Sequence, residues 1–317
     1  MNIFLCFGLI LAAFASCHGV PQPAKIEEHR NWKLLPAKDR CGVSATQQRI
    51  IGGHQAQLGE FPWIARIGYG QRLLGRSGER KNIQYQCGGT LINKHYVLTA
   101  THCALDPDSI VEVRLGENMA YIDPDCMLSS SQGMICAPKV QDIPVIKVIS
   151  HENYSHNRHM TNDIALLRLE RPPILSRYVQ PVCMPFGDGL IRSFENENTI
   201  VAGWGLTEKK VPSNKLLGVQ QKVANGRECV QIYERHEIFV NTSQGQLCVG
   251  GKKGRDSCNG DSGGPLMWTG SFDRSISARV YLLGLVSLGP ADCGVDIPGI
   301  YTRVSYYLNW ILDNIEP

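Results

Sequence analysis

The chain has 317 residues, of which 43% are hydrophobic and 19% are charged, and its formal net charge is +3. This apolar content is enough for a full hydrophobic core, and the chain is too long for a disulfide-dependent mini-protein. So small a positive charge gives no reason to expect a nucleic acid or a membrane surface as partner.

Residues 1–19 have the pattern of a secretory signal peptide. Ile3 to Ala15 is an apolar run that is too short to span a bilayer, and small residues follow it. Cleavage after Ala15, Cys17 or Gly19 fits the small-residue rule, so the exact site stays open. No later run approaches about 18 uninterrupted apolar residues, and we therefore expect a secreted, extracellular protein.

Residues 20–49 are polar and contain proline, and they show little periodicity. We predict a propeptide here rather than a folded domain, followed by one folded domain over residues 50–317. Ten of the twelve cysteines lie from Cys41 onward. An even number of cysteines in a secreted chain predicts a disulfide framework, although sequence alone does not determine its connectivity.

From Ile50 onward, short runs of Val, Ile, Leu and Tyr alternate with Gly, Pro and Asn turns, which predicts an all-β barrel or sandwich. Strands are expected at Thr90–Leu98, Ile110–Leu115, Val145–Ile149, Ile164–Leu169, Thr199–Gly203 and Val280–Ser287. Two helices are expected as well. Asn225 and Glu228 resemble a capping box before residues 229–233, and a helical apolar face runs from Tyr307 to Ile315.

Three motifs with catalytic residue types follow one another in the order His, Asp, Ser. They are Thr99-Ala100-Thr101-His102-Cys103, Asn162-Asp163-Ile164-Ala165-Leu166 and Gly260-Asp261-Ser262-Gly263-Gly264-Pro265. A serine hydroxyl is unreactive at neutral pH unless a base removes its proton, and histidine titrates near that pH. We therefore predict Ser262 as nucleophile, His102 as general base and Asp163 as the group that orients the histidine.

Each of these residues alone has an ordinary explanation, as a surface histidine, a strand-capping aspartate or a turn serine. Their joint order makes coincidence very unlikely, and over roughly residues 50–317 the chain resembles the trypsin/chymotrypsin family of serine proteases. The resemblance implies two six-stranded antiparallel β-barrels, with the active site in the cleft between them and the change of barrel near residues 170–190. It also implies that the backbone N–H groups of Gly260 and Ser262 form the oxyanion hole.

The resemblance further implies a disulfide pattern. The pairs are Cys41–Cys183, Cys87–Cys103, Cys229–Cys248 and Cys258–Cys293, which leaves Cys126 and Cys136 to pair with each other.

A primary specificity pocket for a basic side chain is implied by Asp256, six residues before Ser262. In the family, a carboxylate at this position pairs with the substrate's arginine or lysine and disfavours apolar side chains. Ser287, Gly289 and Gly299 resemble the walls of that pocket. The alternative for Asp256 is a solvated loop residue. At the position of Leu288, many members of the family have tryptophan instead.

Gln48-Arg49-Ile50-Ile51-Gly52-Gly53 resembles a zymogen activation site. In the family, cleavage after the residue at Arg49 frees the amine of Ile50, which pairs with Asp261 and orders the oxyanion hole. A basic residue at Arg49 implies a trypsin-like activator, either an upstream protease or the enzyme itself. A Cys41–Cys183 bridge would keep the propeptide attached and give a two-chain enzyme.

The extra disulfide loop at Cys126 and Cys136 resembles the arthropod clip-domain proteases, which act in melanisation, Toll activation and clotting. With one cysteine in residues 20–49, the six-cysteine clip module is absent, so this would be a clip-less relative. The alternatives are a digestive trypsin, a non-catalytic homologue that binds through its cleft, or a disulfide-rich structural protein.

Cofactors and partners follow from the same resemblance. No cofactor is required; Glu117 opens a loop that binds calcium in some relatives, but one matching carboxylate makes calcium the less favoured alternative. Expected partners are a protein substrate with Arg or Lys at the cleaved bond, an upstream activating protease and a serpin-type inhibitor. Asn153 and Asn241 lie in glycosylation sequons.

Overall fold

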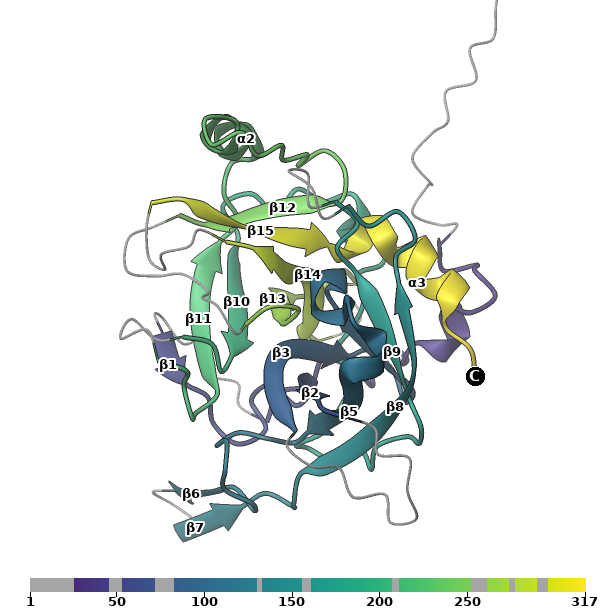
Figure 1. The fold of residues 1–317 in the computed structure, drawn as a ribbon, viewed down its shortest axis with the longest axis vertical. Coiled ribbons are helices and arrows are strands. Elements are labelled where there is room, and N and C mark those ends of the chain that lie inside the picture. The colour runs from purple at the N-terminus through teal and green to yellow at the C-terminus, as the bar shows by residue number, and fades with distance from the viewer. Residues whose placement is uncertain are drawn as a thin grey trace, which may run out of the picture.

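The computed structural model describes residues 26–45, 53–71, 83–129, 133–155, 161–206, 211–251, 261–273, 277–289 and 296–317. Within these residues the chain forms two antiparallel β-structures that lie side by side, with short helices at their margins (Figure 1). The predicted all-β class is confirmed.

The first β-structure is a closed six-stranded barrel in the order β2-β3-β4-β9-β8-β5. Its strands are β2 (Ile64–Tyr69), β3 (Gln84–Leu91), β4 (Tyr96–Thr99), β5 (Ile110–Leu115), β8 (Gln141–Ser150) and β9 (Ala165–Leu169). Alternate residues of these strands, such as Ile67, Leu98 and Leu166, are fully buried inside it.

The prediction of one strand over Thr90–Leu98 was wrong, because a turn divides this segment into β3 and β4. The side-chain oxygen of Asn93 accepts hydrogen bonds from the backbone N–H groups of His95 and Tyr96, both at 2.8 Å. An asparagine that bonds to the backbone two residues on favours a turn over a continuous strand.

The second β-structure is a seven-stranded sheet in the order β1-β11-β10-β13-β14-β15-β12. Its strands are β1 (Gly53–Gln55), β10 (Asn198–Gly203), β11 (Leu217–Lys222), β12 (Gln246–Gly250), β13 (Pro265–Gly270), β14 (Arg279–Leu288) and β15 (Pro298–Arg303). An isolated bridge joins Val223, just after β11, to Val249 in the edge strand β12. The sheet therefore curves towards closure. The family resemblance implied a second six-stranded barrel. In its place the structure has a curved, barrel-like sheet of seven strands, of which the short β1 is the additional one.

One cluster of buried apolar side chains spans both β-structures, and the second sheet has a further cluster of its own. Trp63, at the entry to β2, is fully buried, and its indole N–H lies 3.0 Å from the sulfur of Met267 in β13. Leu282 and Leu285 of β14 belong to the same buried cluster as the side chains of the first barrel. Buried side chains therefore join the two β-structures where they meet.

Short helices and one hairpin complete the fold. The helices are η1 (Trp32–Leu34), η2 (Thr101–Ala104), η3 (Pro107–Ser109), η4 (Gly187–Leu190), α2 (Gly226–Glu234), η5 (Val304–Tyr307) and α3 (Leu308–Asn314). As predicted, Asn225 caps α2, accepting from the N–H groups of Arg227 and Glu228. The hairpin of β6 (Cys126–Ser129) and β7 (Gly133–Cys136) projects away from the first barrel (Figure 1). Among the described helices, none has the length and apolarity needed to cross a bilayer.

Residues 26–45 lie against the body of the molecule, beside α3 (Figure 1). Ile26 and Leu35 are buried there, and Cys41 is bonded to Cys183. Further along, the backbone N–H of Val280 in β14 donates to the carbonyl of Gly42 at 3.0 Å, and Ser44 Oγ donates to the carbonyl of Glu60 at 2.8 Å. This segment is not a domain of its own, but it adds buried contacts to both β-structures.

The contact between this segment and α3 depends on Asn31. Its side-chain amide donates to the carbonyls of Leu312 and Ile315, at 2.9 and 3.1 Å, where the last turn of the helix has no internal partners. We expect Asn31→Ala to lower the free energy of unfolding by about 1–2 kcal/mol, which corresponds to a melting temperature about 2–6 °C lower. Calorimetry checks this. Asn198→Ala, at an exposed asparagine, is the control, and an equal loss in both variants would contradict the role of Asn31.

Candidate active site

Strand register brings His102 and Asp163 to the same end of the first barrel. β4 and β9 are antiparallel neighbours in which Thr99 lies opposite Ala165. His102 lies on η2 just beyond the end of β4, and Asp163 lies just before the start of β9. Two side chains that are remote in sequence therefore meet across one strand pair.

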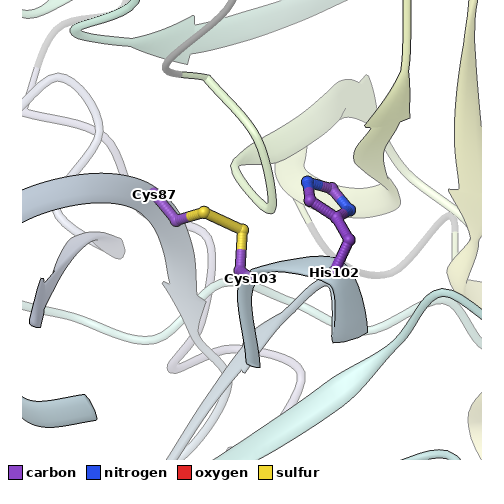
Figure 2. Close-up of side chains that lie close together, drawn as sticks. All are labelled: Cys87, His102 and Cys103. Carbon is purple, nitrogen blue, oxygen red and sulfur yellow. A yellow bond between two sulfur atoms is a disulfide. The ribbon is translucent and has the colours of Figure 1, made fainter. Parts of the chain in front are cut away.

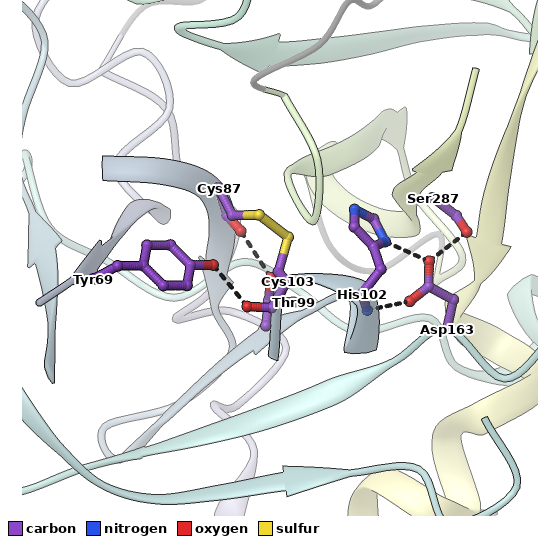
Figure 3. Close-up of a disulfide and its surroundings, with 8 residues drawn as sticks. Tyr69, Cys87, Thr99, His102, Cys103, Asp163 and Ser287 are labelled. Atoms are coloured by element: carbon purple, nitrogen blue, oxygen red, sulfur yellow. Dashed lines mark hydrogen bonds and ion pairs between the residues drawn. A yellow bond between two sulfur atoms is a disulfide. The ribbon is translucent and has the colours of Figure 1, made fainter. Parts of the chain in front are cut away.

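Asp163 is fully buried and makes two contacts with His102 (Figure 3). Its Oδ2 lies 2.7 Å from Nδ1 of the imidazole, and its Oδ1 accepts from the backbone N–H of His102 at 2.9 Å. A carboxylate on Nδ1 keeps the proton on that nitrogen, which leaves Nε2 as the basic atom. The arrangement therefore orients the ring as a general base.

Two side chains of the second β-structure hold the same aspartate. Ser287 Oγ in β14 donates to Asp163 Oδ2 at 2.5 Å, and Thr302 Oγ1 in β15 donates to the Asp163 carbonyl at 2.7 Å. A buried carboxylate is stable only where hydrogen-bond donors replace water, and Ser287 supplies one such donor from the second β-structure, while Thr302 holds the backbone of the same residue. Ser287, predicted as a pocket wall, thus also positions Asp163. No motif marks this second role, nor that of Thr302.

Backbone bonds from both β-structures hold the turn that carries Ser262. The N–H of Gly88 in β3 donates to the Ser262 carbonyl at 2.8 Å, and the N–H of Gly263 donates to the Val286 carbonyl at 2.9 Å. Gly263 has a φ of 73°, and a Cβ there would lie 2.2 Å from Thr99 Oγ1 and 3.1 Å from the Ala100 nitrogen. Only glycine fits so close to the segment that leads into His102. The turn that carries Ser262 is therefore held beside the segment that leads into His102.

Cys87 and Cys103 form a disulfide beside the histidine (Figure 2). Their sulfur atoms and a ring nitrogen of His102 all lie within 4.8 Å of one another. A disulfide offers no thiolate, so this group of residues has no metal-binding character. The bridge instead attaches the His102 turn to β3. The described residues also contain the predicted pairs Cys41–Cys183, Cys126–Cys136 and Cys229–Cys248.

The side chain of Asp261 is directed away from Ser262 and towards the end of β10. The N–H of Gly205 donates to Asp261 Oδ1 at 2.8 Å. A Cβ on Gly203 would lie 2.0 Å from the same oxygen, and one on Gly205 would lie 2.5 Å from Oδ2. Two glycines therefore make the room in which this carboxylate lies next to the serine turn.

Of the remaining predicted residues, some lie in the described part of the chain and some outside it. Gly289 is exposed with open space around it, and Gly299 is buried in β15 opposite Val249. Asn153 and Asn241, of the two sequons, are both exposed. Outside the described residues lie Arg49, Ile50, Asp256, Gly260, Cys258 and Cys293.

A second group of carboxylates lies in the loop after β5. The Glu117 side chain is only 2% exposed; Oε2 lies 3.2 Å from Arg114 Nη1 and 3.7 Å from Arg66 Nη1. Glu117 Oε1 and the neighbouring Asn118 Oδ1 are buried without a hydrogen-bond partner, and both residues line a cavity of about 10 Å³. Burial raises the pKa of Glu117, and nearby Asp125 raises it further. Two orphaned acceptor oxygens at a small cavity fit a single cation.

Known proteins have sequences similar to this chain over most of its length. A family model described as Trypsin matches residues 50–311. The phenoloxidase-activating factor 3 of Holotrichia diomphalia is 40% identical over 286 residues, which cover 89% of this chain and 76% of that protein. The Spaetzle-processing enzyme of Drosophila melanogaster is 40% identical over 309 residues, which cover 94% and 74%.

Melanization protease 1 of Drosophila melanogaster is also 40% identical, over 305 residues that cover 93% of this chain and 73% of that protein. Among solved structures, the chain is similar to the Drosophila Grass clip serine protease of the Toll pathway. The TM-score is 0.74 at 32% sequence identity, and the match covers 92% of this chain and 78% of that one.

Proposed function

The chain belongs to the trypsin family of serine proteases, and from this premise we propose that it is a secreted zymogen whose active form cleaves after arginine or lysine in an extracellular proteolytic cascade. One observation carries the catalytic part of the proposal. The buried carboxylate of Asp163 contacts Nδ1 of His102, and backbone hydrogen bonds from both β-structures hold the turn that carries Ser262.

The proposed reaction proceeds through an acyl-enzyme. Ser262 Oγ attacks the scissile carbonyl carbon while His102 Nε2 takes the hydroxyl proton. The carbonyl oxygen becomes an oxyanion, which the N–H groups of Gly260 and Ser262 stabilise. His102 then gives the proton to the leaving amine as the C–N bond breaks. Water, activated by the same histidine, releases the acyl group. Throughout, Asp163 stabilises the imidazolium form.

In the proposal, specificity and activation rest on two acidic residues that precede Ser262 in the chain. Asp256, together with Ser287, Gly289 and Gly299, forms the proposed pocket for the substrate's basic side chain. In the proposed activation step, an upstream trypsin-like protease cuts after Arg49, and the new amine of Ile50 pairs with Asp261. The Cys41–Cys183 bridge then keeps the propeptide attached as a light chain.

The cascade role rests on the relatives and on the loop between β5 and β8. The named relatives are a phenoloxidase-activating factor, a Spaetzle-processing enzyme and a melanization protease. A protein that is cut after an arginine or lysine is the substrate class that such a role requires, and a serpin-type inhibitor would end the activity. A digestive trypsin is the less favoured alternative, since the attached light chain and the Cys126–Cys136 loop add contacts that bulk digestion does not need.

We propose that calcium is held by Glu117 through Oε1 together with Asn118. The ion would supply positive charge to the buried carboxylates and take no part in the reaction. We expect saturating calcium to stabilise the protein by roughly 2–3 kcal/mol at about 100 times its dissociation constant, and Glu117→Gln to remove this response. Melting curves in calcium, magnesium and EDTA test this. Glu152→Gln, at an exposed glutamate, is the control, and identical curves in calcium and EDTA would contradict calcium binding.

Amidase assays on chromogenic peptides that end in arginine or phenylalanine test the proposed function. The protein is assayed before and after cleavage at Arg49, and Ser262→Ala is the control. We expect arginine cleavage that appears only after the cut and is absent in Ser262→Ala. Activity on phenylalanine alone would refute the role of Asp256, and inactivity of the correctly cut, folded protein on both peptides would refute the proposed peptidase.

A further inference from the structure

The residue before Asp163 has an unusual backbone conformation. Asn162 has a φ of 58°, in the left-handed region that is uncommon for residues other than glycine, although asparagine adopts it more readily than most. The N–H of Ile164 donates to the carbonyl of Asn162 at 2.9 Å, so Asp163 is the central residue of a tight turn. The direction of the Asp163 side chain therefore depends on the conformation of Asn162.

Two hydrogen bonds hold the side-chain amide of Asn162. Its Nδ2 donates to the carbonyl of Asn153 at 2.7 Å, and its Oδ1 accepts from the hydroxyl of Tyr307 at 3.0 Å. Asn153 is exposed, whereas Tyr307, on η5, is only 4% exposed. The tyrosine is therefore the more firmly held of the two partners.

The surroundings of Tyr307 fix its hydroxyl as a donor. Gly245 has a φ of 68°, and a Cβ there would lie 2.5 Å from the hydroxyl oxygen, so glycine leaves room for this group. The ring of His151 contacts the tyrosine edge-on, with 5.5 Å between centroids. Burial raises the pKa of Tyr307 to about 12, so the hydroxyl keeps its proton at neutral pH.

The other contacts of Asp163 act on different parts of this residue. Ser287 and His102 contact its carboxylate, and Thr302 Oγ1 donates to its carbonyl. None of these three contacts holds the peptide that precedes Asp163, which belongs to Asn162. A small displacement of a catalytic group lowers the rate strongly, so a group that holds this peptide contributes to catalysis.

We propose that Tyr307 is a positioning residue for the catalytic aspartate, and that it acts through the side chain of Asn162. Its hydroxyl holds the turn that directs the Asp163 carboxylate to His102, and it takes no part in proton transfer. The inference rests on the proposed function and deepens it, since it assigns a further residue to the support of the same site.

Tyr307→Phe tests the proposal on the cleaved, full-length two-chain protein, because it removes the hydroxyl and keeps the ring. On a chromogenic arginine peptide we expect kcat to fall about 3- to 10-fold while KM changes less than about 2-fold, since substrate binding is untouched. Tyr306→Phe, at the exposed neighbouring tyrosine, is the matched control and should keep both constants. A kcat equal to that of wild type in Tyr307→Phe would overturn the proposal.

A double-mutant cycle separates positioning from a general loss of packing. Asn162→Gly adopts the positive φ without strain and removes both hydrogen bonds of the amide. If Tyr307 acts through Asn162, then Tyr307→Phe added to Asn162→Gly should lower kcat by less than about 1.5-fold further. Loss of packing at Tyr307 would lower kcat equally in both backgrounds, and this additive result would overturn the proposed route through Asn162.

Proton NMR of the uncleaved Ser262→Ala protein gives a readout that needs no activity. The proton between Nδ1 of His102 and Asp163 Oδ2, in a hydrogen bond of 2.7 Å, resonates far downfield. We expect Tyr307→Phe to shift or broaden this resonance and Tyr306→Phe to leave it unchanged. An unchanged resonance in Tyr307→Phe would overturn the positioning role, whereas inactivity of the cleaved wild-type protein would refute only the proposed peptidase.

Discussion

Asp163→Asn is expected to lower kcat by about 10⁴-fold, with the fold retained. The carboxylate accepts from Nδ1 and from the backbone N–H of His102, and from Ser287 Oγ. The asparagine amide has the same shape but puts an NH₂ group where the carboxylate accepted hydrogen bonds. The imidazole then takes the tautomer with the proton on Nε2, and Nε2 no longer accepts the serine proton. The imidazolium that forms during attack also loses its counter-charge. Single-turnover kinetics on an arginine ester, with circular dichroism for the fold, measure both parts.

Asp313→Asn is the matched control for this variant. Asp313 Oδ1 lies 3.1 Å from Nε2 of His29, so it forms a second aspartate–histidine pair, one that is exposed and far from the groove. We expect kcat to be unchanged in this variant, because exposed pairs of this kind contribute little. If Asp163→Asn kept kcat within about 10-fold of wild type, the assignment of His102 and Asp163 to catalysis would be wrong.

Asp261→Asn is expected to lower kcat/KM of the cleaved enzyme by at least about 100-fold, because removing one partner of a buried ion pair costs several kcal/mol. The asparagine side chain still offers an oxygen to the N–H of Gly205, so the loss would report the missing charge rather than the missing hydrogen bond. Without that charge the amine of Ile50 has no partner, and cleavage at Arg49 would no longer order the oxyanion hole.

The informative measurement is the ratio of kcat/KM after and before cleavage at Arg49. We expect a large ratio for wild-type protein and for Asp108→Asn, at an exposed aspartate on η3, and a ratio near one for Asp261→Asn. A wild-type ratio in Asp261→Asn would exclude Asp261 as the partner of the new N-terminus.

Several features of the fold could be predicted because they depend on local pattern. The strand at Ile110–Leu115 coincides with β5, and the capping box at Asn225 predicted the start of α2. Turn chemistry is equally local, and Asn93 was the available signal for the turn that separates β3 from β4. The prediction missed it because the apolar runs on either side look continuous.

The segment before the protease domain shows the limit of such patterns. Residues 26–45 have little periodicity, yet Ile26, Leu35 and Asn31 lie against the folded body. Their partners on α3 and β14 follow more than 200 residues later, and no local rule connects positions so far apart. A segment without a recognisable pattern of its own, predicted not to form a domain, therefore packs against the folded body.

Residue identities and their order along the chain were enough to predict the chemistry. The residue types in three ordered motifs indicate a nucleophile, a base and an orienting acid, because reactivity belongs to side-chain identity and chain order preserves the family pattern. Tertiary structure alone decided what supports and surrounds them. The register of β4 against β9 brings His102 to Asp163, and the packing of two β-structures brings Ser287 to the carboxylate of Asp163 and Thr302 to its backbone carbonyl. A cavity of about 370 Å³ lined by Trp204 and Tyr121 likewise exists only where segments remote in sequence meet, because a volume between side chains depends on their packing and leaves no motif in the chain.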